Sequence, residues 1–164
     1  MRKDGAMVSR VEAHSYRCLR YVDQRLGPFQ VLIGPNASGK STFLDVVAFL
    51  ADLVREKEGV AAAVANRAPD LRDLCWMRQG DVFELAIESV IPDALRVRRN
   101  GSYSQVRYEV RVGLHPDTHE VSLLAEALWL KSESASEERD RPIQRSLFPQ
   151  DVTPPDSVVT PKRA

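Results

Sequence analysis

The chain has 164 residues, 43% of them hydrophobic, which suits one globular domain and excludes global disorder. Lys plus Arg and Asp plus Glu both number 23, so the net charge is zero, which argues against an obligate nucleic-acid coat protein and leaves a local basic patch open. The longest apolar stretch, residues 43–54, contains two aspartates and is too short to cross a bilayer, and the N-terminus has no secretory pattern. With only two cysteines, in no metal-binding spacing, these features predict a cytoplasmic protein without membrane or metal-cluster partners.

The first third of the chain predicts two strands and two helices. Residues 7–13 alternate apolar and polar side chains, and 29–33 form an almost entirely apolar run of the kind buried in a parallel sheet. Apolar residues then recur at helical spacing from residue 43 and predict an amphipathic helix ending near Gly59. A second, alanine-rich helix is expected at about 60–67.

A period of two follows in three later segments, residues 83–88, 106–112 and 121–129. Asn100-Gly101 is a strong hairpin signal between the first two, and a loop at 115–118 separates the second and third. Together they predict an antiparallel β-meander subdomain at about 82–130. The fold class is therefore mixed α/β, with a parallel-type βα start followed by this meander.

The last 34 positions, residues 131–164, lose all regular patterning and contain five prolines. Prolines block both helices and strand ladders, so this segment is predicted to be a largely disordered tail after a domain at 1–130. It is interpreted as a solvated end, the stump of a longer domain, or a docking tail.

One motif carries chemistry. Residues 34–42 read Gly-Pro-Asn-Ala-Ser-Gly-Lys-Ser-Thr and match the Walker A pattern G-x-x-x-x-G-K-[ST] between a predicted strand and a predicted helix. Glycines let the backbone approach a polyphosphate, whose oxygens the loop N–H groups and the helix N-terminus bind. Lys40 is expected to reach the β- and γ-phosphates as the catalytic residue, and Ser41 to bind Mg²⁺. The predicted nucleotide site is Gly34, Pro35, Asn36, Ala37, Ser38, Gly39, Lys40, Ser41 and Thr42.

Residues 31–44 resemble the P-loop region of ABC-class ATPase heads of the SMC, RecF and OLD type, a group of AAA family ATPases, although Ala37 stands where glycine is commoner. The segment 14–17 resembles the Asn-Phe-Arg segment of such heads, but only Arg17 carries over, as a nucleotide contact. Residues 71–80 resemble the stretch that ends in Arg-x-Gly before their β-subdomain, so the resemblance covers about 7–130.

Other parts of such heads have no counterpart in the sequence. After the predicted helix that begins at residue 43 there is no run of four apolar residues followed by Asp, the pattern of a Walker B strand, and there is no Leu-Ser-Gly-Gly signature. His115 and His119 flank a predicted hairpin loop and are not interpreted as a switch histidine, and a GTPase Asn-Lys-x-Asp motif is absent. Because the resembled heads carry the missing parts in a C-terminal lobe, the resemblance implies an N-terminal lobe alone.

The function expected on this basis is binding of Mg-ATP, with hydrolysis dependent on a C-terminal lobe supplied elsewhere or on a second copy of the head. The alternatives are a non-catalytic, nucleotide-responsive interaction module and a truncated, inactive fragment. The basic run at 96–100 is interpreted as a contact for nucleic-acid phosphates or, more simply, as a solvated strand end.

Overall fold

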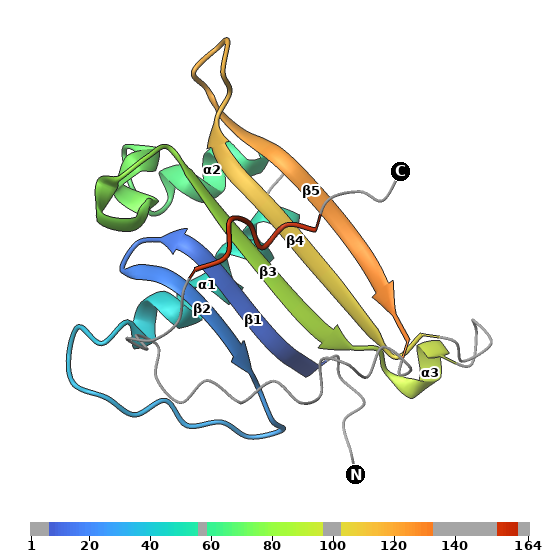
Figure 1. The fold of residues 1–164 in the computed structure, drawn as a ribbon. Coiled ribbons are helices and arrows are strands. Elements are labelled where there is room, and N and C mark those ends of the chain that lie inside the picture. The colour runs from blue at the N-terminus through green and yellow to red at the C-terminus, as the bar shows by residue number, and fades with distance from the viewer. Residues whose placement is uncertain (1–6, 56–58, 97–102, 133–153, 161–164) are drawn as a thin grey trace.

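A computed structural model describes residues 7–55, 59–96, 103–132 and 154–160, which form a five-stranded antiparallel sheet in the order β2-β1-β3-β4-β5 with helices on one face (Figure 1). The strands are β1 (Met7–Tyr16), β2 (Leu19–Arg25), β3 (Val82–Val90), β4 (Gln105–Leu114) and β5 (Val121–Lys131). The helices are α1 (Lys40–Arg55), α2 (Gly59–Ala65) and α3 (Asp93–Arg96), with 3-10 turns at Leu71–Leu74 and Trp76–Arg78.

The strand expected at 29–33 is wrong. These residues form no strand, and the side chains of Phe29 and Ile33 are 84% and 89% exposed. A parallel-type βα start is accordingly not found in the described ranges, where each strand pairs antiparallel to its neighbour. A buried strand needs a hydrogen-bonded neighbour on each side. β1 already has β2 on one side and β3 on the other, so residues 29–33 cannot pair with it.

The strand that sequence reasoning missed, β2, pairs with β1 through a tight turn at Arg17 and Cys18. Arg17 adopts a φ of 50°, the left-handed conformation that such two-residue turns require. The alternation in β2 is interrupted by Asp23 and Gln24, which face a polar environment in the sheet rather than solvent. Its composition therefore gave no strand signal.

The two helices and the meander are confirmed. The expected helices correspond to α1 and α2, and the three period-two segments correspond to β3, β4 and β5. The loop at 115–118 joins β4 to β5, whereas Asn100-Gly101 lies outside the described residues. Among the described helices, none has the length and apolar character needed to cross a membrane.

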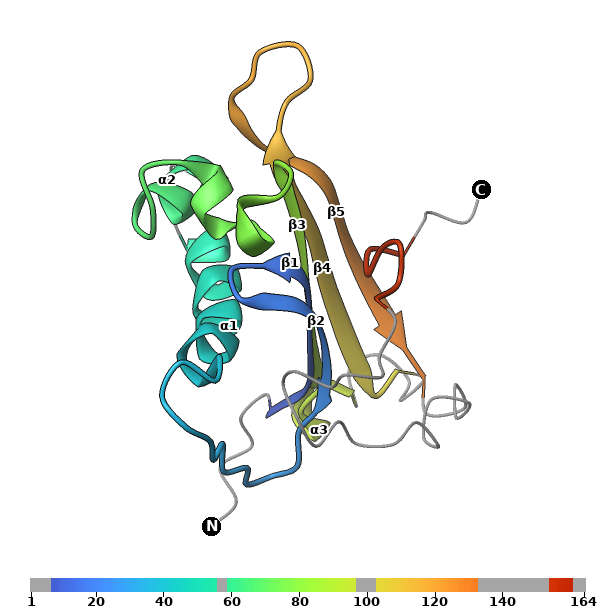
Figure 2. The ribbon, with the colours of Figure 1, turned by 60° about the vertical axis from the view of Figure 1, so that its left-hand side comes forward.

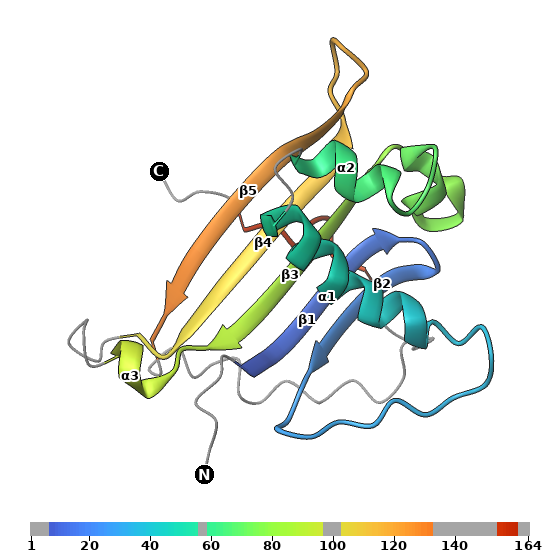
Figure 3. The same cartoon turned by 180° about the vertical axis from the view of Figure 1, so that it is seen from behind.

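The hydrophobic core lies between the sheet and α1, which crosses the sheet on one side (Figures 2 and 3). Tyr16, Phe49 and Phe83 form its centre, with ring centroids 5.0 to 6.1 Å apart. Aromatic side chains bury large apolar areas and pack edge to face, so this trio joins β1 and β3 to α1. The helix that follows residues 34–39 is thereby fixed on the sheet.

The opposite face of the sheet carries charged side chains that are buried instead of solvated. Arg10, Glu84, Glu88, Arg107 and Glu109 are each no more than 9% exposed. Residues 154–160, drawn in red in Figure 2, lie across this face. The division of the chain at residue 130 stays a prediction, but this part of the expected tail is packed on the sheet.

Candidate functional site

Residues 34–39 form a loop that leads directly into α1, whose first turn contains residues 40–42, and the whole stretch is here called loop 34–42. A Cβ on Gly34 would lie 2.7 Å from Ser38 Oγ, so any other residue at this position would displace the Ser38 hydroxyl. Gly39 and Ala37 both adopt positive φ, at 79° and 63°. An alanine in the left-handed region costs about 1–2 kcal/mol, so the loop holds its shape at Ala37 against a local penalty.

Lys40 folds back into this loop. Its Nζ donates hydrogen bonds to the carbonyl oxygens of Gly34 and Pro35, at 2.8 and 2.6 Å, and to Ser38 Oγ at 3.2 Å. All three acceptors are neutral, and no carboxylate in the described part of the chain lies within 4.0 Å of the ammonium group. A cation balanced only by dipoles, at the positive end of a 16-residue helix, creates a site that favours an anion.

The nine predicted residues are consecutive in the sequence and lie in the loop and the first turn of α1. Ser41 is exposed at the second position of α1, and Asn36 is exposed on the loop. Thr42 Oγ1 accepts a hydrogen bond from the Cys18 thiol, at an S–O distance of 3.3 Å. The turn between β1 and β2 therefore contacts the start of α1, and its exposed thiol lies beside the loop.

Arg17 lies on the same turn and points toward Asp45 of α1. Its Nε is 3.4 Å from Asp45 Oδ2, and its backbone N–H donates to the Leu74 carbonyl. The Tyr16 hydroxyl donates to the same carboxylate at 2.7 Å, and burial together with this bond raises the pKa of Tyr16. In this geometry Arg17 is adjacent to the loop without contacting it, and its role as a nucleotide contact stays a prediction.

Asp45 and Arg67 belong to this neighbourhood and were missed by sequence reasoning. Arg67 Nε donates to Asp45 at 2.8 Å and its Nη2 donates to Asp52 at 2.7 Å, which links the turn after α2 to α1. A signal was present, because residues seven apart on a helix share a face, and two aspartates on one face indicate a common cation. This bridge anchors the helix whose first turn closes the loop.

The described residues contain no cluster of three or more His, Cys, Asp or Glu side chains able to hold a metal ion. The role of Ser41 as a ligand of Mg²⁺ stays a prediction.

Comparison with known proteins gives two similarities. Residues 29–146, more than half of the chain, match the family described as "AAA domain, putative AbiEii toxin, Type IV TA system". A stretch of 41 residues is 39% identical to the OLD nuclease of Thermus scotoductus (strain ATCC 700910 / SA-01). That stretch is 25% of this chain and 8% of the length of the nuclease.

Proposed function

The chain belongs to the family of AAA domains described as putative AbiEii toxin, Type IV TA system, and from this premise we propose that loop 34–42 binds Mg-ATP. The observation that carries the proposal is the Lys40 ammonium group, held inside the loop by neutral oxygens alone. ATP supplies the polyphosphate charge that this cation and the start of α1 attract.

Each residue of the loop has a different role in binding Mg-ATP. Lys40 exchanges its neutral acceptors for phosphate oxygens, whose negative charge adds a direct Coulombic attraction to the hydrogen bonds of the ammonium group. Gly34 lets the backbone approach the phosphates, and Ser41 offers its hydroxyl to Mg²⁺. Thr42 contacts the β1–β2 turn through the Cys18 thiol, so this turn lies beside the site.

Hydrolysis by this site depends on residues from outside the chain. Phosphoryl transfer needs an acid that positions the metal and a group that orients water, and the sequence after α1 has no Walker B pattern. We propose that the site is the N-terminal lobe of an SMC/RecF/OLD-like, ABC-class head, completed by a C-terminal lobe from a partner or by a second copy. The cytoplasm, which supplies Mg-ATP and keeps Cys18 and Cys75 as free thiols, is the proposed location.

The apolar residues that precede the loop support a missing lobe. Phe29, Val31 and Ile33 are 84%, 57% and 89% exposed, and their spacing of two places them on one side of an extended segment. Exposed apolar side chains in this pattern favour addition to a sheet that residues 7–55, 59–96, 103–132 and 154–160 do not provide. Completion of the head would bury them.

Thermal unfolding with and without Mg-ATP tests the binding proposal. At a hundredfold excess over Kd, ATP stabilises the folded chain by about 2.7 kcal/mol, which is roughly 5–11 °C for a chain of this size. Lys40→Ala should remove the shift and keep the apo melting temperature. Arg55→Ala, which removes an exposed positive charge at the other end of α1, is the matched control and should keep the shift.

An ATP shift that is absent from the wild-type chain, or that survives in Lys40→Ala, would overturn the binding proposal. ATP turnover by the purified chain that is lost in Lys40→Ala would instead overturn the dependence on a second lobe. A shift without turnover in either protein supports both parts.

A further inference from the structure

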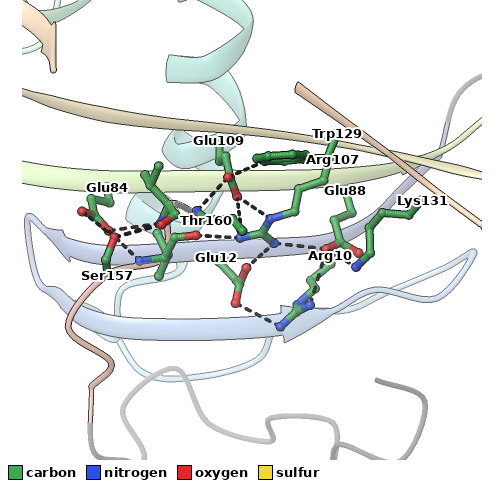
Figure 4. A network of polar contacts seen from close by, with 12 residues as sticks. Arg10, Glu12, Glu84, Glu88, Arg107, Glu109, Trp129, Lys131, Ser157 and Thr160 are labelled. Carbon is green, nitrogen blue, oxygen red and sulfur yellow. Dashed lines mark hydrogen bonds and ion pairs between the residues drawn. The ribbon is translucent and has the colours of Figure 1, made fainter. Parts of the chain in front are cut away.

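A second built site lies on the face of the sheet opposite α1. Its centre is a pair of carboxylates, Glu84 of β3 and Glu109 of β4, whose residues are 2% and 0% exposed. Residues 154–160 pass directly over them, as Figure 4 shows. More than 50 residues of sequence separate these carboxylates from the groups that they bind on this segment, so the contact is not a local turn.

Glu84 binds the main chain of the segment. Its Oε2 accepts the backbone N–H of Val158 at 2.6 Å and that of Val159 at 3.4 Å. The Ser157 hydroxyl is 2.9 and 3.0 Å from the two carboxylate oxygens. On the sheet itself, Arg111 lies 3.5 Å away and is half exposed, so the segment supplies the closest donors to this buried charge.

Glu109 and Arg107 bind the next residues in the same way. Thr160 donates its backbone N–H to Glu109 Oε1 at 2.7 Å and its hydroxyl to Oε2 at 3.2 Å. Arg107 Nη2 donates to the Val158 carbonyl at 2.9 Å, so this residue is held at both its N–H and its C=O. Charged side chains of the sheet therefore bind main-chain groups of the segment through charge-assisted hydrogen bonds, which is chemistry suited to holding a peptide.

We infer that this face is a peptide-binding site, and that residues 154–160 are its ligand, bound within the same chain. The main-chain contacts require a backbone that bends at residues 156, 158 and 159, and the side-chain contacts set the preference for particular residues. A ligand needs hydroxyls at the positions of Ser157 and Thr160 and a small apolar side chain at Val158, which is 8% exposed.

The groove continues beyond the segment. A cavity of about 540 Å³ is lined by Pro155, Val158 and Thr160 of the segment together with Tyr21, Trp129 and Lys131 of the sheet. Trp129 Nε1–H donates to Glu109 Oε1, the same oxygen that accepts Thr160 N–H, at 2.6 Å. The site is independent of loop 34–42, which lies at the start of α1 on the opposite face (Figure 2).

The inference is tested by asking whether a free peptide can take the place of residues 154–160 on the sheet. Val158→Asp in the full chain places a carboxylate beside Glu84 and should release the segment, seen as loss of hydrogen-exchange protection at residues 157–160. A fluorescent peptide of the sequence 154–160 should then bind the variant but not the wild type, whose attached segment competes at an effective concentration of about millimolar. Alanine for serine and threonine in the peptide should weaken binding about tenfold or more.

Two further variants serve as an alternative to Val158→Asp and as a control. Ser157→Ala/Thr160→Ala alters exposed side chains and should also admit the peptide, should Val158→Asp fail to fold. Asp156→Asn, on the same segment and exposed, should behave as wild type. Two results would overturn the inference: an unprotected segment in the wild-type chain, or a folded variant with a released segment that binds no peptide.

Discussion

Replacement of Arg107 by methionine should be the most damaging single change on the charged face of the sheet. The guanidinium group donates to Glu109 at 2.7 Å, to Glu88 at 3.1 Å and to Glu12, and so joins carboxylates from three strands. Burial alone would lower the pKa of Arg107, but Glu12 and Glu109 outweigh it and raise that pKa, which keeps the group charged. Methionine preserves the length of the apolar stem and removes the charge.

The size of the stability loss depends on which carboxylates that pair with Arg107 keep another cation as a partner. Glu12 still pairs with Arg10 at 3.0 Å, and Glu88 still pairs with Lys131 at 3.1 Å. Glu109, with 0% exposure, loses its ion-pair partner among the described residues. Removal of one member of a buried ion pair costs about 3–5 kcal/mol, a large share of the roughly 5–15 kcal/mol that stabilises a domain.

Urea unfolding followed by circular dichroism measures this cost, with an unchanged m-value as the sign of a simple loss of stability. Arg107→Met/Glu109→Met removes both charges and should recover at least about 2 kcal/mol relative to the sum of the single variants. Additive effects, or a loss below about 1 kcal/mol for Arg107→Met, would refute the view that the network is buried and coupled.

Three further predictions concern single sites. Ala37→Gly removes a left-handed alanine that costs about 1–2 kcal/mol while adding about 0.4–1 kcal/mol of unfolded-state entropy, so the urea midpoint should rise slightly; a clear fall would contradict the strained loop. Burial raises the pKa of Cys75 to about 11 whereas Cys18 is exposed, so a thiol reagent at pH 8 should label Cys18 alone in the native protein, and more slowly with Mg-ATP; rapid labelling of both thiols would count against this burial. Burial lowers the pKa of His14 below its usual 6.5, so the unfolded chain binds protons more readily and the free energy of unfolding should fall as the pH drops below about 6.5; His14→Gln should flatten this slope, and equal slopes in the two proteins would exclude the effect.

The candidate site was predictable because its signals are local. Glycine at 34 and 39, Lys40 and the helical spacing that follows lie in one continuous stretch, and each acts through backbone geometry within a few residues. The partners of Asp45 were harder to predict from the sequence, since Arg67 reaches it from the turn that follows α2. Only the seven-residue spacing of two aspartates hinted at a shared cation.

Whether a segment joins the sheet depends on residues far from it in the sequence. The sequence therefore predicted a strand at 29–33 that does not form and missed β2. The run 29–33 has strong strand character but finds no partner in the described chain, whereas the charged β2 pairs with β1 because the turn at Arg17 returns the chain beside it. Strand pairing is decided by available neighbours, and composition reports only the environment that a strand would prefer.

The amino-acid sequence by itself determined the phosphate-type loop, α1 and the alternation of β3, β4 and β5, since each depends on spacing within one segment. Polar and apolar residues alternate around Glu84 and Glu109, which predicts that one face of these strands is polar. This sequence pattern is the same whether water or protein covers the polar face. The tertiary structure decided that this face is buried, because its covering groups, at Val158 and Thr160, arrive from a distant part of the chain. Burial of charge is a property of the assembled layers, and no single strand encodes it.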